Sequence, residues 1–477
     1  MKQMKAMDER YLAAVDLGTS TVRLCVGHVS GNDIQIEYFK EVASEGIRSS
    51  VIFNPQLVTD TVGSLVRDAE AALMARITGV VVGLPRKDVA EITASMKLNR
   101  PDPDEYISRG EIEELKELAL DTYPLPLPDK QEIYSAVAQY YEIDDALTLP
   151  EKEVDGTLGS TIEGRFKVFV GRRQATAALD KVFHKLGIAV VRRYFLPEVV
   201  PPVVLTEVER TGGVAIVDIG SGVTSVAVYK GGVLRHYASI PFGGDTVTGD
   251  IRTECVLPED LAEKIKVRFG TCLPDRLGGQ SEKVLDVRVA DPPMEIPVKF
   301  LSEIVDSRYR EILEAVLYLI QESGEQDSLR SGIVLVGGGA EQTHLDSLLK
   351  ELSGYRVRKG KIRNLFTSAV GKAVLSTKNA SVLGLLVAAK DMGAGDCLAF
   401  QERTLRVDES QELEETVSEP QDTLAELEGT VSDPQGTIGA PEVEPGLVKT
   451  LKGQLKIIWK TIENKALAVY DYLNSET

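Results

Sequence analysis

The chain has 477 residues, a formal net charge of −19, and 43% hydrophobic against 27% charged residues. This length allows two or three packed units, and the negative charge argues against nucleic acid as a partner. No apolar run reaches the roughly 18 residues of a membrane-spanning helix; the longest is 382–389. The first ten residues lack the apolar stretch of a secretory signal. Four scattered cysteines without a C-x-x-C pair argue against a zinc site and indicate a reducing compartment.

Residues 11–400 alternate between short apolar segments and amphipathic ones, which is typical of an α/β domain. The predicted strands are 11–15, 22–26, 80–82, 168–170, 214–217, 226–229 and 333–336. The predicted helices are 55–76, 112–121, 175–186, 258–268 and 300–322.

The strongest motif is an internal duplication. Residues 16–26 (DLGTSTVRLCV) align without gaps with residues 218–228 (DIGSGVTSVAV). Each copy follows one apolar strand and precedes another, so we predict a hairpin with small residues at its tip. Backbone N–H groups at such a tip can surround an anion, and the aspartate at the strand end can hold Mg²⁺ through water. Two ordinary tight hairpins are the alternative, because Gly and Asp are common in turns.

Two further segments add glycines and charges. Gly337 to Gly339 follow the predicted strand 333–336, at a turn where glycine lets the backbone approach a ligand such as a nucleoside. Glu263 and Lys266 share one face of the predicted helix 258–268, although a solvated surface pair is the alternative. No G-x-x-x-x-G-K-[ST] loop occurs, so the chain is not a P-loop nucleotidase.

In this order the motifs resemble the actin-like ATPase superfamily, and within it the FtsA family of bacterial cell-division proteins. The likeness is carried by 15–21 (VDLGTST), 217–224 (VDIGSGVT), 240–244 (IPFGG) with Thr248 and Asp250, 262–266 (AEKIK) before Phe269 and Gly270, 304–312 (IVDSRYREI), 336–340 (VGGGA) and the C-terminal amphipathic segment. It runs from about residue 11 to residue 388 and resumes at 447.

The resemblance implies an α/β, actin-like fold with two related lobes around a nucleotide cleft and an inserted FtsA-type subdomain. The implied parts are an N-terminal tail (1–10), lobe 1 (11–83 and 165–212), the inserted subdomain (84–164), lobe 2 (213–400), a disordered acidic linker (401–446) and an amphipathic membrane-targeting helix (447–477).

The resemblance also implies that the cleft binds ATP and Mg²⁺. Asp16 and Asp218 would lie near the hydrated metal. The other implied cofactor-binding residues are Gly18, Thr19, Ser20, Thr21, Gly220, Ser221, Gly222, Thr224, Gly243, Gly244, Glu263, Lys266, Gly337, Gly338 and Gly339.

One segment departs from the family pattern. Residues 196–205 should contain a helix of small residues, but Pro201 and Pro202 disfavour a helix interior. Glu198 is the only carboxylate there, and we identify no general base. Phosphoryl transfer depends mainly on positioning and charge stabilisation. We therefore expect ATP binding with at most weak ATPase activity, and we assign no catalytic residue.

The composition changes after residue 400. Residues 401–445 hold thirteen acidic residues against two arginines, a net charge of −11, and no aromatic residue, which predicts disorder. From residue 447 apolar residues recur at intervals of three and four with lysines on other sides, which predicts a basic amphipathic helix. Its candidate membrane contacts are Leu451, Leu455, Ile458, Trp459, Ile462, Lys452, Lys456 and Lys460. The lysines and the tryptophan favour a membrane interface; a helix docked on the core and a coiled coil are the alternatives.

The resemblance implies a cell-division protein that self-associates head to tail into filaments. It would tether the FtsZ ring to the cytoplasmic face of the cell membrane at the septum and recruit other division proteins. The C-terminal tail of FtsZ would dock on lobe 2, where Arg308 is a candidate contact; an ordinary helix-surface role is the alternative.

Three rivals share the fold. A PilM-like pilus-assembly adaptor would lack the tail helix. A sugar kinase would need a catalytic aspartate in a sugar pocket and extra subdomains, for which the sequence offers no candidate. A heat-shock-class chaperone would need a folded substrate domain where the acidic linker lies. Fold alone does not separate these functions.

Overall fold

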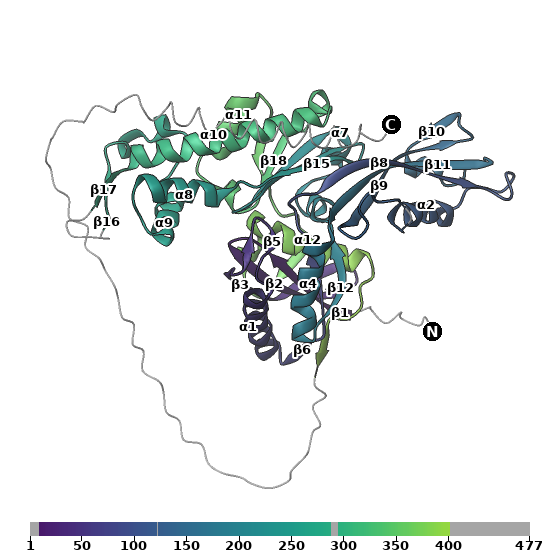
Figure 1. Cartoon of the computed structure of the whole chain (residues 1–477), viewed down its shortest axis with the longest axis horizontal. Helices are drawn as coiled ribbons and strands as arrows, with labels where there is room; N and C mark the ends of the chain where they lie inside the picture. Colours follow the sequence, from purple (N-terminus) through teal and green to yellow (C-terminus); the bar gives the residue numbers. More distant parts are fainter. Residues whose placement is uncertain (1–8, 122, 288–293, 401–477) are drawn as a thin grey trace, which may run out of the picture. The chain divides into compact units, whose positions relative to one another are not determined.

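The computed structural model describes residues 9–121, 123–287 and 294–400 (Figure 1). All of these residues lie in one compact unit, and the predicted linker and amphipathic helix fall outside them. Within the described residues, no helix combines the length and the apolar character needed to cross a membrane. The predictions for residues 401–477, including the membrane-contacting side chains, therefore stay predictions.

Lobe 1 is built around a six-stranded sheet with the order β12-β7-β1-β2-β3-β20. Its strands are β1 (Glu9–Leu17), β2 (Thr21–Ser30), β3 (Asp33–Ala43), β7 (Gly79–Gly83), β12 (Ala189–Tyr194) and β20 (Phe366–Ser368). The first three strands form an antiparallel meander, whereas β7 pairs with β1 in parallel. Helices α1 (Pro55–Leu73) and α4 (Arg173–Leu186) pack on each other beside this sheet (Figure 1).

Lobe 2 repeats this topology in a five-stranded sheet with the order β15-β14-β13-β18-β19. Its strands are β13 (Val214–Ile219), β14 (Thr224–Lys230), β15 (Val233–Ile240), β18 (Ile333–Val336) and β19 (Val357–Lys359). Strand β13 is antiparallel to β14 and parallel to β18, just as β1 is to β2 and β7. The duplicated hairpins are confirmed, and the duplication extends to the sheets around them.

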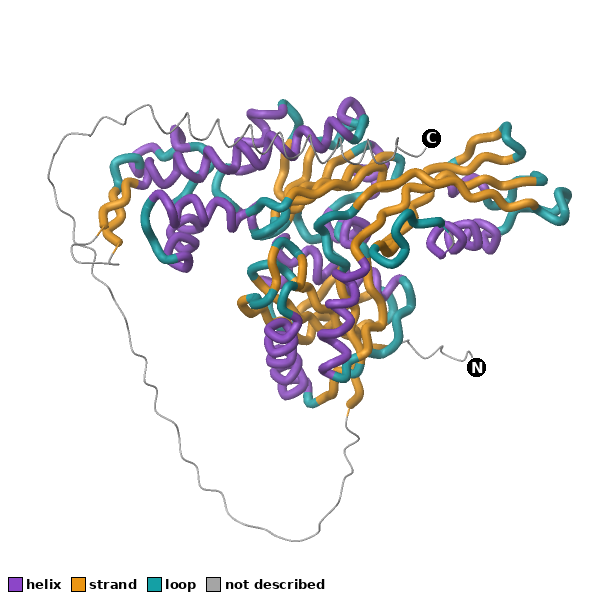
Figure 2. Tube along the Cα trace, in the orientation of Figure 1, coloured by secondary structure: helices purple, strands orange, loops and turns teal. Residues whose placement is uncertain are grey.

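The described part of lobe 2 contains five α-helices, which are α7 (Glu207–Gly212), α8 (Gly244–Glu254), α9 (Glu259–Phe269), α10 (Val298–Glu322) and α11 (Leu345–Ser353). Of these, α7, α10 and α11 contact the sheet of lobe 2, and α8 begins four residues after β15 ends. Helix α8 packs on both α9 and α10 (Figure 2). The predicted helices 258–268 and 300–322 are confirmed, with ends that differ by at most two residues.

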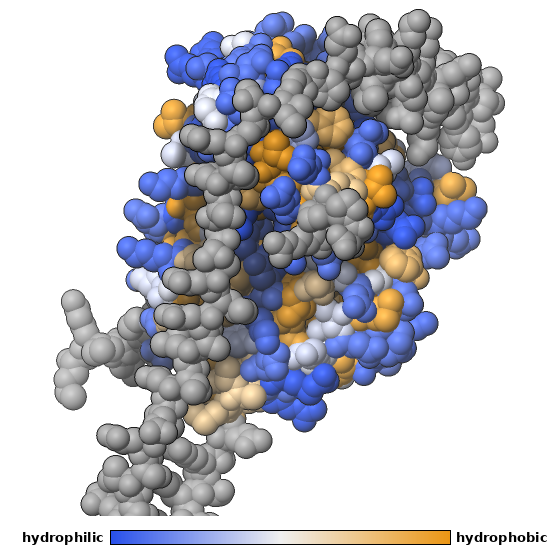
Figure 3. All heavy atoms as spheres, turned by 90° about the vertical axis from the view of Figure 1, so that its left-hand side faces the viewer, coloured by the Kyte–Doolittle hydropathy of each residue, from blue (hydrophilic) through white to orange (hydrophobic). Residues whose placement is uncertain are grey.

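One end of lobe 2 carries α9 and a ribbon of β16 (Val284–Val287) and β17 (Met294–Pro297). The face seen from this side mixes hydrophilic and hydrophobic side chains (Figure 3). Val256, Val267 and Val284, in or beside these elements, are exposed. Single exposed apolar side chains are normal on globular proteins, so these valines need no functional explanation.

The insertion between the lobe 1 strands folds into its own four-stranded sheet, with the order β10-β9-β11-β8. Its elements are β8 (Ala90–Asn99), α2 (Arg109–Asp121), β9 (Gln131–Ile143), β10 (Leu147–Leu149), α3 (Glu151–Val154) and β11 (Thr161–Arg172). The predicted strand 168–170 was assigned to lobe 1, and this placement was wrong. Because β11 pairs with β8 as far as Val170 and with β9 as far as Arg172, the sheet of the insertion continues past residue 164.

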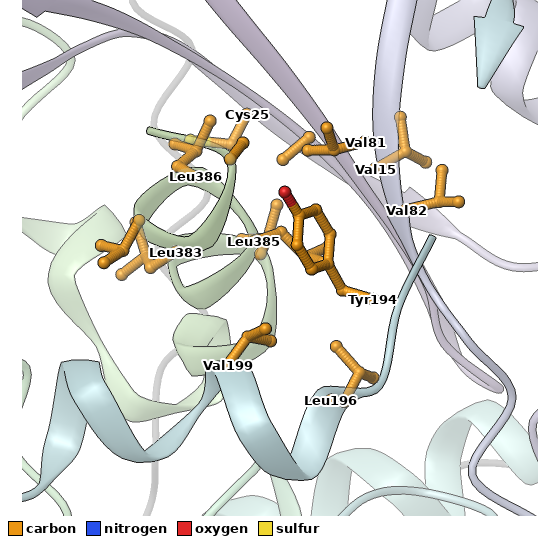
Figure 4. Packing of buried hydrophobic residues seen from close by; sticks show 14 of the residues in the cluster. Val15, Cys25, Val81, Val82, Tyr194, Leu196, Val199, Leu383, Leu385 and Leu386 are labelled. Carbon is orange, nitrogen blue, oxygen red and sulfur yellow. The ribbon is translucent and has the colours of Figure 1, made fainter. Parts of the chain in front are cut away.

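The longest apolar run of the sequence forms α12 (Ala380–Asp391), a helix that is apolar all round and therefore buried. It packs on β1, β7 and the short helices α5 (Leu196–Val199) and α6 (Pro201–Val204). In Figure 4, Leu385 lies close to the ring of Tyr194, and Leu386 lies beside Cys25 of β2. The assignment of all of 213–400 to lobe 2 therefore needs correction, because α12 belongs to the core that contains β1 and β7.

The chain after α12 also joins lobe 1. Strand β21 (Leu398–Phe400) pairs with β6 (Ala75–Ile77), and the Cys397 N–H donates to the Tyr11 carbonyl at 2.8 Å. A two-stranded ribbon of β4 (Ile47–Arg48) and β5 (Val51–Ile52) completes the lobe. The sequence pattern could not show these pairings, because they join segments far apart in the chain.

Two helix boundaries follow local chemistry. Helix α1 ends at Leu73, short of the predicted residue 76, because Met74 takes a left-handed conformation with φ of 50° and β6 follows. The segment 196–205 is helical but interrupted, with α5 ending before Val200 and Pro201 opening α6. A proline at the first helical position loses no hydrogen bond, so the expected exclusion of proline from a helix interior holds.

Glu91, on β8, connects the insertion to lobe 2 through its side-chain bonds. We expect the Glu91→Gln variant to lose about 2 kcal/mol of stability near neutral pH. The carboxylate accepts from the Tyr237 N–H at 3.0 Å, contacts His236 Nδ1 at 3.1 Å and is paired with Lys167. Burial works to raise the pKa of Glu91, but the bonds from His236 and Lys167 outweigh it and lower the pKa.

A carboxyl whose folded-state pKa is lowered contributes stability above its unfolded pKa of about 4.3, and loses it as the pH falls through the folded value. Urea unfolding at a series of pH values should show wild type and Glu91→Gln converging as the pH falls below about 4. The exposed Glu114 of α2 supplies the control variant, Glu114→Gln, which should track wild type. A gap for Glu91→Gln that stays constant with pH would contradict this account.

Candidate functional site

The two duplicated hairpins have the same tight turn. The Gly18 N–H donates to the Thr21 carbonyl at 3.0 Å, and the Gly220 N–H donates to the Val223 carbonyl at 2.9 Å. A Cβ on Gly18 would lie 2.6 Å from the Thr21 oxygen, so this turn needs glycine. In each hairpin the aspartate sits one residue before the end of its strand.

The two hairpin tips face each other across the lobes. A Cβ added to Gly222 would lie 2.9 Å from the Thr19 Oγ1 atom, which shows how closely the second tip approaches the first. Ser20 Oγ donates to the Asp245 carboxylate of α8 at 3.1 Å. The two duplicated hairpins are therefore not unrelated turns, because both tips line the same space.

The glycine turn after β18 closes onto the second hairpin. Gly337 has φ of +88°, and a Cβ there would lie 2.5 Å from the Ile219 carbonyl oxygen and would also strike the Asp218 carboxylate. Only glycine fits this backbone and this approach. The turn thus brings a third stretch of backbone to the same space.

These elements enclose a cavity of about 290 Å³. The predicted residues that line it are Asp16, Gly18, Thr19, Ser20, Thr21, Asp218, Gly220, Ser221, Gly222, Gly244, Glu263, Lys266, Gly337, Gly338 and Gly339. Two predicted residues, Thr224 and Gly243, are not part of this lining. Thr224 is fully buried in β14, whereas Gly243 precedes α8 and packs against the backbone of the second hairpin.

Glu263 and Lys266 form the expected pair on α9, but Lys266 is not a surface residue. Its side chain is 5% exposed, and Nζ donates to Glu263 at 2.6 Å, to Thr248 Oγ1 at 2.8 Å and to the Gly244 carbonyl at 3.0 Å. The buried ammonium therefore ties α9 to the first turn of α8 at the wall of the cavity.

Sequence reasoning missed Arg86, which follows β7 and reaches the middle of the cavity wall. Its guanidinium donates to Asp218 at 2.6 Å and to Ser381 Oγ at 2.6 Å. Burial works to lower the pKa of Arg86, but the carboxylates of Asp218 and Asp16 outweigh it and raise the pKa. Burial raises the pKa of Asp218, and Arg86 opposes that rise.

The topology of the lobe 1 sheet explains why Arg86 reaches the cavity. Strand β7 is parallel to β1, so the residues after both strands emerge at the same edge of the sheet, where ligands bind in open α/β sheets. The cavity lining also contains further residues that the motifs did not indicate, namely Arg23, Ser50, Asp245, Tyr309, Gln342, Lys378 and Ser381.

The two predicted metal ligands, Asp16 and Asp218, each already have a cationic partner. Arg23 pairs with Asp16 at 3.4 Å, and Arg86 pairs with Asp218 at 2.6 Å. Among the described residues, no group of three or more His, Cys, Asp or Glu side chains is arranged to hold a metal ion. Because each carboxylate already faces a guanidinium, the two aspartates as arranged do not fit a divalent cation between them.

Arg308, the candidate partner contact, is engaged inside lobe 2. Its guanidinium donates twice to Asp250 of α8, at 2.5 and 3.0 Å, and once to Glu311, at 2.5 Å. Its side chain is 13% exposed. These bonds hold α10 against α8, and a contact of Arg308 with a partner stays a prediction.

The family model and the relatives that match this chain in sequence are FtsA proteins. The family model "Cell division protein FtsA" matches residues 215–384. The FtsA of Neisseria meningitidis serogroup B is 29% identical over 384 residues, which cover 80% of this chain and 90% of that protein. The FtsA of Escherichia coli K12 is 27% identical over 371 residues, covering 76% and 86%.

Among solved structures, a PilM-PilN type IV pilus biogenesis complex aligns with a TM-score of 0.53 at 15% identity, covering 79% of this chain and 98% of that chain. At this identity the match concerns the fold alone, and it agrees with an actin-like architecture.

Proposed function

Because this chain is similar in sequence to the FtsA cell-division proteins and has an actin-like fold, we propose that its cleft binds ATP. ATP-loaded chains would assemble head to tail into filaments. The filaments would tether the FtsZ ring to the cytoplasmic face of the cell membrane at the septum and recruit other division proteins there.

The observation that carries ATP binding is the pair of glycine hairpins that face each other across one cavity. Backbone N–H groups at both tips and the positive N-terminal end of α8 would supply the donors and the charge that a polyphosphate needs. Glu263 and Lys266 would face the nucleoside, with the Gly337 turn behind it. These assignments follow the family pattern and the shared lining of the cavity.

The proposal includes at most weak ATPase activity. The described lining of the cavity does not include Glu198, the only carboxylate of the segment 196–205, and burial raises the pKa of its carboxyl group. We therefore keep the catalytic residue unassigned, and phosphate turnover should be slow compared with nucleotide exchange.

Membrane attachment would reside in residues 447–477, and we expect Trp459→Glu to abolish sedimentation with anionic liposomes. In a helix the tryptophan lies on the apolar face, where a carboxylate would resist entry into the interface. The matched control is Asn464→Glu, which makes the same charge change on the opposite face and should sediment like wild type. Unchanged sedimentation of Trp459→Glu would remove the membrane-tethering part of the proposal.

Binding of the FtsZ C-terminal peptide separates this proposal from its rivals. Fluorescence anisotropy of the labelled peptide should show saturable binding to the full chain, and a scrambled peptide should not bind. A PilM-like adaptor or a kinase of the same fold gives no reason for such binding. Failure of the peptide to bind would contradict the FtsZ-tethering function. It would not bear on nucleotide binding, which a separate titration tests.

A further inference from the structure

The two aspartates that close the duplicated strands share one guanidinium. Arg86 Nη1 donates to Asp218 Oδ2 at 2.6 Å, and Arg86 Nη2 lies 4.0 Å from Asp16 Oδ1. The exposed fractions of the three side chains are 15% for Arg86, 13% for Asp218 and 8% for Asp16. A buried positive charge thus stands where carboxylates from the two lobes converge.

Arg86 is held in this position by its main chain as well as by its side chain. Its N–H donates to Ser50 Oγ at 3.1 Å in lobe 1. Its carbonyl accepts from Tyr237 Oη and from Ser239 Oγ, both at 2.9 Å, in lobe 2. Nη2 also donates to Ser381 Oγ at 2.6 Å. Hydrogen bonds thus hold both the main chain and the guanidinium of Arg86 in the cleft, unlike a mobile surface side chain.

A guanidinium and a divalent cation compete for the same carboxylate oxygens. Mg²⁺ in nucleotide sites is held by one or two carboxylates together with the phosphates. A dication beside Asp218 would lie next to the like charge of Arg86, which lacks bulk water to screen it. The guanidinium has five N–H donors, so it can keep its bonds to Asp218 and Ser381 while donating to a phosphate oxygen.

We propose that the guanidinium of Arg86 takes the place of the divalent cation in this cleft, so that a nucleoside polyphosphate binds without needing Mg²⁺. The inference rests on the proposed nucleotide binding. Arg86 neutralises the two aspartates and offers its remaining donors to a phosphate seated between the hairpin tips. Because Asp218 belongs to lobe 2, the same side chain connects phosphate occupancy to both lobes.

The test is a titration of the full chain with a fluorescent ATP analogue, in excess EDTA and in excess magnesium chloride. For wild type we expect the two dissociation constants to agree within about threefold. For Arg86→Ala we expect a larger dissociation constant in EDTA than for wild type. Magnesium should then lower the dissociation constant of this variant by at least about tenfold, because the vacated carboxylates become available to the metal. Arg109→Ala removes an arginine that is 88% exposed on the insertion, and should behave like wild type.

Each outcome has one meaning. Wild-type binding that weakens more than about threefold in EDTA overturns the inference and leaves ATP binding intact. Metal independence that persists in Arg86→Ala also overturns it, because another group would then replace the cation. Wild type that binds in neither buffer contradicts the proposed nucleotide binding itself. If Arg86→Ala does not fold, the wild-type comparison still decides, and Arg86→Lys, which keeps the charge without the planar fork, provides the second variant.

Discussion

Replacing Gly337 by alanine should destabilise the protein by about 3 kcal/mol and weaken nucleotide binding together with it. The residue has φ of +88°, which is costly for any side chain, and the added Cβ would press on the Ile219 carbonyl and on the Asp218 carboxylate. Both neighbours belong to the second hairpin, so relief of the clash must move the phosphate-facing turn.

The adjacent Gly338 supplies a matched control. It lines the same cavity, its φ is −65°, and a Cβ there would meet nothing within 4 Å. Gly338→Ala should therefore unfold at the wild-type urea concentration or slightly above it, since alanine also restricts the unfolded chain. Equal unfolding curves for the two alanine variants would contradict the close approach of the Gly337 turn to the second hairpin.

Replacing Lys266 by methionine should cost about 2 kcal/mol and lower the affinity for ATP by about tenfold. Methionine fills similar space but removes the ammonium that donates to Glu263, Thr248 and the Gly244 carbonyl. The carboxylate of Glu263 is 47% exposed and can be hydrated, which limits the cost.

Lys264→Met is the control on the same helix, because Lys264 is exposed. We expect its stability and ATP affinity to match wild type. Urea unfolding and nucleotide titration of both variants separate the two effects. A Lys266→Met protein that is destabilised but binds ATP normally would restrict Lys266 to joining α8 and α9, and would remove it from the nucleotide site.

The hairpins and the glycine turn could be predicted because their signals are local. An aspartate at a strand end followed by Gly18 or Gly220 requires a tight turn, and the repetition of the motif showed that two such turns belong together. The helices α9 and α10 were predicted for the same reason, since an amphipathic period is a property of consecutive residues.

The predictions from sequence that were wrong, and the residue that was missed, depend on contacts between segments far apart in the chain. Nothing local shows that α12 packs beside β1, or that β11 continues into the sheet of the insertion. Arg86 was missed because a single arginine after a strand has no motif. Its role becomes visible only when β7 lies parallel to β1 and the chain brings Asp218 from the other lobe.

The central claim is that the cavity between the hairpins binds ATP, and the most direct measurement is a titration of wild type and Gly338→Phe with a fluorescent ATP analogue. Gly338 lines the cavity, and a Cβ added there meets nothing within 4 Å, so we expect the phenyl ring of Gly338→Phe to block the ligand and leave the fold intact. Gly279→Phe, at an open position outside the cavity lining, is the control.

The account predicts saturable binding by wild type and by Gly279→Phe, with one site per chain and competition by unlabelled ATP, and a loss of at least about tenfold in Gly338→Phe. Absence of binding by wild type, or equal binding by Gly338→Phe, would contradict it.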